Sequence, residues 1–420
     1  MTQAPSIRAV TSITDVAESQ LCAGCGACAA AEPGKIRMVD DIGVGRRPVQ
    51  LEPLIDGRAL SVCPGIELRH DRSSWDAGWS EALADEWGPV LAVWEGHAVD
   101  EELRFRGSSG GVTSALALHS LSSTGAQAVV HSGPRPGQVL FNDAVRSSSR
   151  EEMLARAGSR YSPASPCEGL APGAGSVAFV GKPCDVAGAR ALQEQGALRE
   201  TEVNLTIAIF CAGAPSTQAT LDYLERESSL QSDELEELRY RGHGWPGNFM
   251  AADREGRSVE SSYAASWAQL QAGRPWRCRI CPDHSGEFAD ISVGDPWHTP
   301  PKPGEPGRSL VVARTARGRA AVEAAIAAGV VALQPVPDHL LPASQEELRK
   351  TRRAVFGRML AMRIARVPTP RFAGMALAKT WRRSPAGELL RSLFGTLRRL
   401  KRYGLGHRRP VEAHQYTEGV

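Results

Sequence analysis

The sequence predicts an α/β protein whose core is a largely parallel sheet. Two observations lead to this fold class. Short apolar segments alternate with helical segments from Pro89 onward, whereas residues 1–88 are rich in loops, glycine and cysteine. Strands that alternate with helices are joined by crossover connections, so they lie parallel and are buried on both faces. We therefore expect an α/β domain that follows a small module organised by metal.

The elements of this domain follow from hydrophobic periodicity and from turn residues. The expected strands are 90–94, 126–131, 176–180, 205–210, 291–293 and 310–313, and the expected helices are 110–121, 151–157, 184–193, 216–227 and 318–328. One long helix is expected over 339–364, before Pro368 and Pro370 break the pattern. The segment 238–286 is rich in Gly, Trp and Arg, and we expect it to fold back over the α/β domain.

Composition and charge exclude several classes of protein. The 420 residues suffice for two or three domains, and 42% hydrophobic with 23% charged residues are ordinary globular values. The net charge of +2 argues against a protein devoted to nucleic acid. No stretch approaches 18 consecutive apolar residues, and the first 30 residues lack the features of a signal peptide, which predicts a cytoplasmic location. Because thiols stay reduced there, we expect the nine cysteines to be metal ligands, redox groups or buried side chains rather than disulfides.

The strongest motif is a run of three cysteines, Cys22, Cys25 and Cys28, with a distant Cys63. Two-residue gaps let one loop wrap three corners of an iron–sulfur cubane, and the intervening glycines let the backbone turn tightly. Bacterial ferredoxin runs end in Cys-Pro, and Cys63 precedes Pro64, so Cys63 is the expected fourth ligand. The motif predicts a ferredoxin-like module with a 4Fe-4S cluster. A structural zinc site is the alternative, although zinc ligands usually come as two separated pairs.

Four of the other five cysteines can form a second set. Cys184 and Cys211 follow two expected strands, so both lie at the carboxyl edge of the sheet, where open α/β sheets bind ligands. The pair Cys278 and Cys281 can fold down onto this edge and complete four thiolates. Taken singly, Cys184 and Cys211 would be small buried hydrophobes. Cys167 has no partner at a suitable spacing, and we expect a plain thiol.

The segment Gly107-Ser108-Ser109-Gly110-Gly111 leads into an expected helix. Free amides and the positive end of the helix dipole suit a phosphate group, but many such loops are only tight turns. Lys182 follows an expected strand, and it suits either a contact with a bound group or a solvated surface position.

Several segments together resemble the beta-subunit family of coenzyme F420 hydrogenases and dehydrogenases, which also includes formate dehydrogenase beta chains and 7-hydroxymethyl chlorophyll a reductase. Beyond residue 300 the resemblance is weak. Asp185 stands where relatives often have Gln, and Pro296 lies within a Gly-Asp-x-Trp motif, so both depart from the family pattern. The matching segments occur in family order at 21–28, 107–113, 158–161, 180–184, 210–213, 241–247, 278–283 and 290–297.

The resemblance implies a flavin enzyme with FAD and up to two 4Fe-4S clusters, the second held by Cys184, Cys211, Cys278 and Cys281. It supports binding of the FAD phosphates by Gly107, Ser108, Ser109, Gly110 and Gly111. Lys182 is a further candidate flavin contact. His243 and Trp245 are expected to shape the flavin pocket or, alternatively, only to form a structural turn.

The expected function is electron transfer between 4Fe-4S clusters and an organic two-electron partner, either the deazaflavin coenzyme F420 or a small unsaturated substrate. One alternative is a non-catalytic electron-transfer subunit of a larger hydrogenase- or dehydrogenase-type complex. Another is a zinc-organised interaction or nucleic-acid module. No catalytic acid or base can be identified.

Two basic segments suggest partners. Arg274, Arg277 and Arg279 surround the Cys278–Cys281 pair. These arginines can be interpreted in two ways. They form either a positive patch that binds an acidic ferredoxin-type donor, or ion pairs with Asp283 and Glu287 that hold the loop shut.

The C-terminal segment predicts a basic amphipathic helix, which either packs on the domain or contacts an acidic partner or an anionic membrane. The apolar face of this helix is formed by Leu389, Leu393, Leu397 and Leu400. The basic residues around it are Arg391, Arg398, Arg399, Lys401 and Arg402. The sequence thus divides into an iron–sulfur module (1–88), an FAD and iron–sulfur binding α/β domain (89–366) and a basic tail (367–420).

Overall fold

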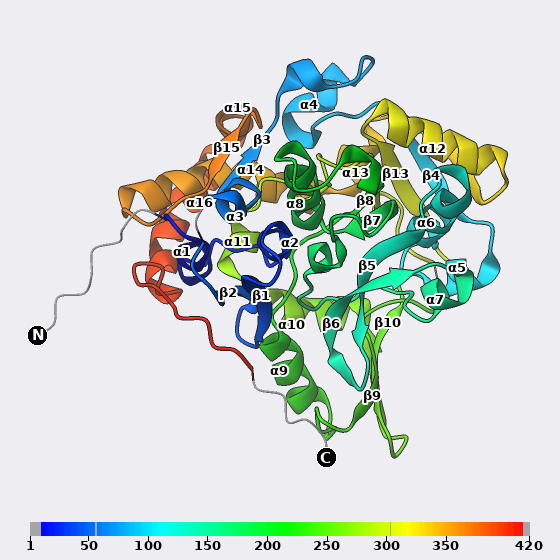
Figure 1. Ribbon diagram of the computed structural model, residues 1–420, viewed down its shortest axis with the longest axis horizontal. Coiled ribbons are helices and arrows are strands. Elements are labelled where there is room, and N and C mark those ends of the chain that lie inside the picture. Colours follow the sequence, from blue (N-terminus) through cyan, green and yellow to red (C-terminus); the bar gives the residue numbers. More distant parts are fainter. Residues whose placement is uncertain (1–9, 55–56, 303, 415–420) are drawn as a thin grey trace, which may run out of the picture.

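The computed structural model describes residues 10–54, 57–302 and 304–414, and its centre is an eight-stranded sheet (Figure 1). The strand order is β14-β4-β13-β12-β8-β7-β5-β6. Four neighbouring strands run parallel, namely β12 (Ile291–Gly294), β8 (Val203–Ile209), β7 (Val177–Gly181) and β5 (Ala128–Arg135). The predicted α/β fold with a parallel core is confirmed.

Antiparallel strands complete both edges of the sheet. β6 (Gln138–Ser147) forms a hairpin with β5 at one edge. At the other edge, direction alternates through β13 (Ser309–Ala313), β4 (Ala92–Ala98) and β14 (Val331–Pro335). These flanking strands leave the carboxyl ends of β7, β8 and β12 together at one edge of the parallel core.

Helices cover both faces of the sheet. α6 (Val112–Ser123) and α12 (Ala316–Ala327) pack on one face against apolar strand residues, and α5 (Glu101–Arg106) and α7 (Arg150–Leu154) lie beside α6. α8 (Pro183–Glu194) and the 3-10 turn η2 (Pro166–Gly169) pack on the opposite face. Each parallel strand is therefore buried on both sides, as its continuous apolar sequence predicts.

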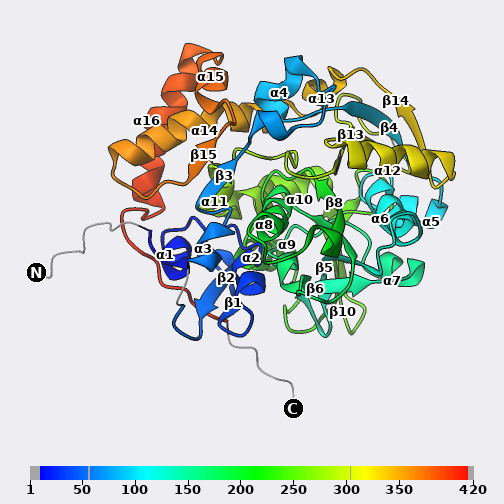
Figure 2. The same ribbon diagram turned by 45° about the horizontal axis from the view of Figure 1, so that its top comes forward.

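The N-terminal segment packs against the helix α8. It contains α1 (Ile13–Glu18), α2 (Ala27–Ala31), the hairpin β1 (Ile36–Asp41) and β2 (Gly45–Gln50), α3 (Arg58–Ser61), β3 (Glu67–Arg69), η1 (Arg72–Ser74) and α4 (Glu81–Trp87). Ile13, Leu21 and Met38 share one apolar cluster with Met359 and Leu400 near the C-terminus, and the blue and orange-red elements lie side by side in Figures 1 and 2. The ferredoxin-like architecture and the three-part division remain predictions.

The segment predicted to fold back forms a second small sheet. β9 (Leu235–Arg239), β10 (Asn248–Asp253) and β11 (Ser258–Ser262) are antiparallel. They share a core of Tyr223, Tyr240 and Phe249 with α9 (Thr217–Glu227) and α10 (Tyr263–Leu270). The chain returns through η4 (Gln271–Gly273) and α11 (Trp276–Arg279), so the second cysteine pair lies over the main sheet. A further turn, η3 (Glu200–Glu202), precedes β8.

The long helix predicted over 339–364 is divided into α13 (Leu340–Ser344) and α14 (Glu346–Ile364). Gln345 separates them with φ −131° and ψ 44°, and its side-chain amide donates to the Asp295 backbone oxygen at 2.6 Å. The prediction of one helix is wrong because this contact removes Gln345 from the helical path.

The predicted tail helix exists as α16 (Ala386–Arg402), which packs across α14 and follows β15 (Arg371–Ala373) and α15 (Leu377–Arg382). On its predicted apolar face, Leu400 is buried and Leu389, Leu393 and Leu397 are half-buried. Leu390 and Phe394, which lie outside that face, are each 56% exposed. The length and hydropathy needed to cross a membrane are found in no helix of the described residues.

Candidate redox site

The four N-terminal cysteines are all buried, with exposures between 6% and 9%. The loop that carries the first three turns at Gly24 and Gly26, whose φ angles are 75° and 87°. Burial and the neighbouring sulfur atoms raise the pKa of the Cys28 and Cys63 thiols. Four thiolates gathered in this environment would require bound cations, which is the chemistry of a metal centre.

Cys167 lies directly beside this first set. Its amide donates to the backbone oxygen of Cys25 at 3.1 Å, and its Sγ donates to the backbone oxygen of Asp185 at 3.3 Å. The Cys167 thiol lowers the pKa of Cys25. A Cβ atom on Gly188 of α8 would lie 3.2 Å from Cys25 Sγ and 3.6 Å from Cys167 Sγ. Gly188 therefore allows α8 to pack directly on the sulfur atoms.

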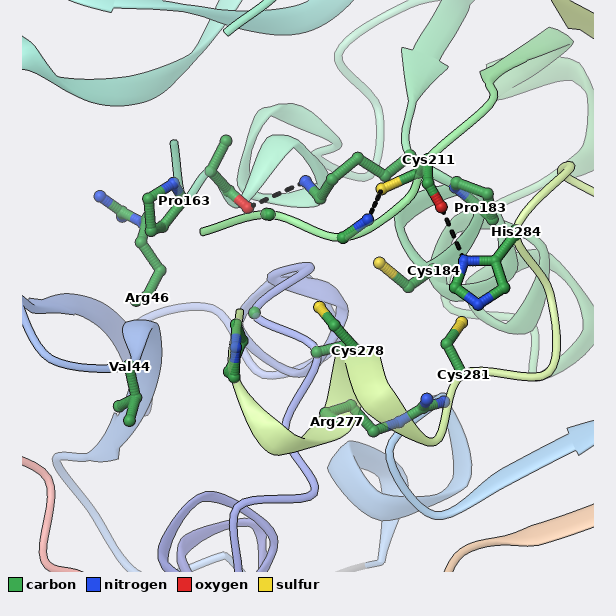
Figure 3. Close-up of a pocket in the computed structure, with 18 of the residues that line it drawn as sticks. Val44, Arg46, Pro163, Pro183, Cys184, Cys211, Arg277, Cys278, Cys281 and His284 are labelled. Carbon is green, nitrogen blue, oxygen red and sulfur yellow. Dashed lines mark hydrogen bonds between the residues drawn. The ribbon is translucent and has the colours of Figure 1, made fainter. Parts of the chain in front are cut away.

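The second set of cysteines lines one cavity of about 40 Å³ (Figure 3). Cys184 lies in the first turn of α8, after β7, and Cys211 follows β8. Cys278 belongs to α11, and Cys281 follows it. The structure thus brings these four residues together at the carboxyl edge of the parallel strands. Cys184 and Cys211 were expected there because they follow neighbouring strands, and the Cys278–Cys281 pair because its loop can fold down onto that edge.

Backbone contacts position the second set. The Gly213 amide donates to Cys211 Sγ at 3.3 Å, and the Cys281 Sγ donates to the Asp283 backbone oxygen at 2.9 Å. His284 Nδ1 lies 2.7 Å from the Cys211 backbone oxygen. Burial raises the pKa of Cys281 to about 11 and that of Cys211 to about 12.

A site for a single metal ion and a site for an iron–sulfur cluster require different arrangements of their ligands. Among the described residues, no three His, Cys, Asp or Glu side chains are arranged to hold a single metal ion. In a 4Fe-4S cluster each cysteine binds a different iron, so the thiolates surround a larger group. The donor chemistry of the buried first set and of the half-buried second set fits such a group.

A larger cavity of about 270 Å³ adjoins the second set. Gly107, Ser108, Ser109 and Gly111 line it where α6 begins. No side chain caps α6 at Gly111, which has a φ of 70°, so the first amides of this 12-residue helix are available to an anion. The lining also includes aromatic side chains suited to a planar ring, which are Tyr161, Tyr263, Trp267 and Trp297.

Arg241 connects the parts of this larger cavity. It is 3% exposed, and its guanidinium donates to the Asp295 carboxylate at 2.7 and 2.8 Å and to the Ser108 backbone oxygen at 2.7 Å. It also lies 4.7 Å from the Tyr263 ring centroid, a cation–π distance. Arg241 therefore ties the glycine-rich loop to the end of β12.

The two cavities share one wall. Ala164, Lys182, Cys211, Gly213 and Ala214 line both of them. Lys182 Nζ lies 2.6 Å from the Asp185 carboxylate, and Asp185 raises the pKa of Lys182 against the opposing effect of burial. A cationic side chain thus stands between the second cysteine set and the larger cavity.

Comparison with known families identifies this arrangement. Two sequence models of the family described as "Coenzyme F420 hydrogenase/dehydrogenase, beta subunit" match the chain, the N-terminal model at residues 93–171 and the C-terminal model at residues 174–339. The chain belongs to this beta-subunit family. Membership makes it a redox protein of the oxidoreductase type.

Two relatives illustrate the breadth of the beta-subunit family. The coenzyme F420 hydrogenase subunit beta of Methanococcus voltae is 26% identical over 253 residues, which cover 57% of this chain and 83% of that protein. A chain of the F420-reducing [NiFe] hydrogenase complex from Methanosarcina barkeri has a TM-score of 0.52 at 20% identity, covering 66% of this chain and 94% of that chain. The structural likeness shows the fold.

Three predicted flavin contacts of this beta-subunit homologue do not line the larger cavity. Gly110 packs elsewhere, since a Cβ there would lie 2.6 Å from Arg308 Cα. His243 lines a neighbouring cavity of about 280 Å³, and its ring stacks on that of Phe105 with the centroids 5.2 Å apart. Trp245 is buried behind the wall, where its ring stacks on Trp297 and its Nε1 donates to Asp295 at 2.8 Å.

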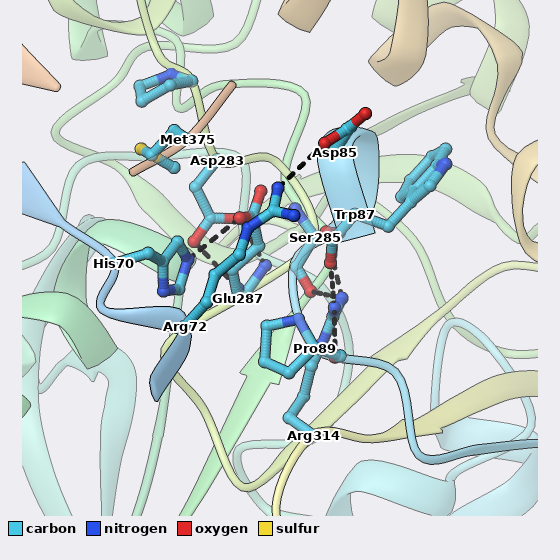
Figure 4. Close-up of polar contacts among 12 residues, drawn as sticks. His70, Arg72, Asp85, Trp87, Pro89, Asp283, Ser285, Glu287, Arg314 and Met375 are labelled. Carbon is cyan, nitrogen blue, oxygen red and sulfur yellow. Dashed lines mark hydrogen bonds and ion pairs between the residues drawn. The ribbon is translucent and has the colours of Figure 1, made fainter. Parts of the chain in front are cut away.

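A buried network of charges holds the loop that follows Cys281 (Figure 4). The Asp283 carboxylate accepts hydrogen bonds from the amides of Ser285, Gly286 and Glu287 at 2.7 to 3.0 Å. Glu287 forms an ion pair with Arg352, and its carboxylate lies 3.0 Å from His70 Nε2. Other anchors of this loop are the contacts of Arg314 with the backbone oxygens of Trp87, Pro89 and Ser285.

The arginines around Cys278 do not match either sequence-based interpretation. Arg277 is only 2% exposed and donates to the Pro64 backbone oxygen at 2.9 Å, so a surface patch that includes it is wrong. Arg274 donates to Ala212 and Arg279 to Ala272, both at backbone oxygens. The expected pairing with Glu287 is also wrong, because Arg352 approaches that carboxylate from α14.

Proposed function

We propose that this chain is an FAD- and iron–sulfur-dependent oxidoreductase, with a 4Fe-4S cluster at each cysteine set and FAD in the larger cavity. The observation that carries the proposal is the shared wall, because Cys211 and Lys182 line both the second cysteine cavity and the larger one. A redox group bound at either side would be separated from the other by these few residues.

The residues of the larger cavity fit FAD in two respects. The amides at the start of α6 and the loop at Ser108 and Ser109 suit the diphosphate. Tyr263 and Trp297, whose rings stack at 5.7 Å, offer a flat aromatic wall near Arg241. FAD accepts electrons singly or in pairs, so it links one-electron clusters to a two-electron partner.

This chain's own residues would orient the flavin and compensate its charge. Arg241 holds the glycine-rich loop, and Lys182 places its ammonium group between the two cavities. The organic partner would be the deazaflavin coenzyme F420 or a small unsaturated substrate. All nine cysteines are free thiols, which suits the reducing environment of the cytoplasm.

A second candidate function is that of a non-catalytic electron-transfer subunit. It is favoured by the printed names of the relatives, a hydrogenase subunit beta and a hydrogenase complex. A ferredoxin-type donor or partner subunits would then supply the electrons. The helix α16 exposes Arg391 and Arg398 beside Leu390 and Phe394, and it offers one surface for an acidic partner or an anionic membrane.

Anaerobic purification tests both functions on one sample. The proposal expects about eight irons, eight sulfides and one FAD per chain, with reduction of F420 or an unsaturated acceptor by the isolated chain. The same cofactor content without turnover would favour the electron-transfer subunit. A preparation free of flavin and of iron after anaerobic reconstitution would contradict both.

A further inference from the structure

The larger cavity also borders the cavity that His243 lines, which we call the third cavity. The two have similar volumes, about 270 Å³ and about 280 Å³, and both are lined by residues 157–160 and by Arg241. A single short segment of chain therefore separates their contents. An organic partner that reaches a flavin in the larger cavity can place its remaining part in the third cavity.

Arg160 lies in this common lining and carries a charge that no carboxylate balances. Its Nη1 donates to the backbone oxygen of Leu238 at 2.9 Å, and its Nε and Nη2 donate to Asn142 Oδ1 and to the backbone oxygen of Val139. All three acceptors are neutral. No described residue forms an ion pair with Arg160, and burial lowers the pKa of its guanidinium. Buried charges are normally paired, so an anion from outside the chain would complete this site.

The other charges of the third cavity also favour an anion. Four arginines but only two glutamates line it. Arg241 is already paired at the end of β12. Arg106 pairs with Glu102, both 43% exposed, and Arg239 Nε lies 3.8 Å from Glu237, which is 52% exposed. Exposed pairs of this kind are weak, so the positive charges of Arg106 and Arg239 remain available to a bound anion.

We propose that the third cavity binds a carboxylate or phosphate group of the organic two-electron partner, held by Arg160, an inference that rests on the proposed function. The planar guanidinium suits both groups, because each offers two or more oxygen atoms to its N–H donors. The partner is thereby restricted to an anionic molecule whose redox-active part lies in the larger cavity. A neutral unsaturated substrate would leave the charge of Arg160 unbalanced.

Calorimetry of the full chain loaded with FAD tests this site, with inorganic phosphate as the probe. Because FAD occupies the larger cavity under the proposed function, phosphate reports on the third cavity. Arg160→Met is expected to weaken phosphate binding by about tenfold or more, since one charged hydrogen-bonding group is lost. Arg146→Met is the matched control and should leave phosphate binding unchanged. Arg146 likewise donates to backbone oxygens, those of Gly169 and Ala174, but it is exposed and lines neither cavity.

Two artificial electron acceptors connect this site to the redox reaction. The reduced chain is reoxidised either by naphthoquinone sulfonate, which is anionic, or by menadione, which is a neutral quinone. Arg160→Met is expected to raise KM for the sulfonate by about tenfold, and to leave kcat and the reaction with menadione unchanged. Inorganic phosphate should compete with the sulfonate and not with menadione.

The outcomes separate this inference from the proposed function. Phosphate binding that Arg160→Met leaves unchanged overturns the inference. Loss of flavin from this variant would show that Arg160 binds FAD, and it would overturn the inference as well. An unmodified chain that binds no flavin overturns the proposed function instead. Should Arg160→Met fail to fold, Arg106→Glu decides the matter, because this exposed side chain lines only the third cavity and its reversed charge should weaken phosphate binding.

Discussion

Arg241 and Asp295 form a two-point ion pair, with N–O distances of 2.7 and 2.8 Å, at the edge of the larger cavity. Asp295 follows β12, and Arg241 comes from the segment that folds back between β9 and β10. The same guanidinium donates to Ser108 in the glycine-rich loop. One side chain thus joins three segments that are distant in the sequence.

Arg241→Met is expected to release bound FAD. The substitution leaves the Asp295 carboxylate without its partner in a largely buried position, an effect of about 3–5 kcal/mol for such pairs. The flavin-to-protein absorbance ratio and thermal unfolding measure the result. The matched control is Arg150→Met, which removes an exposed ion pair with Asp100 and should leave flavin binding and stability nearly unchanged, because solvent screens such pairs. Full flavin occupancy in Arg241→Met would contradict the assignment of the larger cavity as the FAD site.

Gly110→Ala should destabilise the chain far more than Gly137→Ala. Both glycines have positive φ, 66° and 70°, so both substitutions carry the same backbone strain. Only at Gly110 would the new Cβ meet backbone, 2.6 Å from Arg308 Cα, whereas Gly137 has open space. Denaturant unfolding of the two variants compares them directly. Equal losses of stability would show that strain, and not the close packing, matters.

Cys63→Ser is expected to remove about four irons per chain while the flavin stays bound. Cys63 belongs to the buried first set, and the larger cavity does not include it. Iron, sulfide and flavin are counted on one anaerobic sample. Cys167→Ser is the control, because we predict that Cys167 is not a ligand. Loss of iron in the control, or none in Cys63→Ser, contradicts the first ligand set.

Arg352→Met should lower stability by up to about 3–5 kcal/mol, since the buried Glu287 then loses its arginine partner and keeps only the contact with His70. The Arg352 and Glu287 side chains are only 4% and 1% exposed. Arg353→Met on the same helix removes a pair with Glu86 that is 24% and 12% exposed, so a smaller loss is expected. Thermal unfolding of both variants is the measurement, and equal shifts would mean that the Arg352 pair has no special role.

The stability of the chain should fall as the pH falls from about 6.5 toward about 4, partly because of His131. Burial lowers the pKa of this 7%-exposed histidine to about 4, so the unfolded chain binds a proton that the folded chain excludes. The difference corresponds to about 3 kcal/mol. His131→Gln should flatten this part of the stability-versus-pH curve in denaturant unfolding. An unchanged slope would mean that His131 is protonated in the folded chain.

The sequence was sufficient for the buried strands and insufficient for the polar ones. β5, β7, β8, β12 and β13 are apolar on both faces, and each was predicted. β6 was missed because it is an edge strand in which Asn142, Asp143 and Arg146 interrupt the apolar pattern. β2 was missed for a related reason, since Arg46 is buried by pairing with Asp40 and Glu168. Charge pairing across segments leaves no periodic signal.

The residues of the candidate site also fall into those that the sequence could place and those that it could not. Cys184 and Cys211 could be placed together because both follow neighbouring parallel strands. The positions of His284 and Tyr263 could not be derived, because each depends on how a distant loop returns to the sheet. Residue spacing within a segment is visible in a sequence, whereas contacts between segments arise only from the packing of the whole chain.

The close packing of Gly188 on Cys25 places α8 between the two cysteine sets, since the same helix carries Cys184. Cys184 and Gly188 are one helical turn apart, a rise of about 6 Å. Under the proposed cofactor content, the hopping distance for an electron between the two clusters is therefore set by rigid helix geometry and not by loop motion. Inserting one residue within this turn would rotate Cys184 by about 100° around the helix axis and would interrupt conduction between the centres.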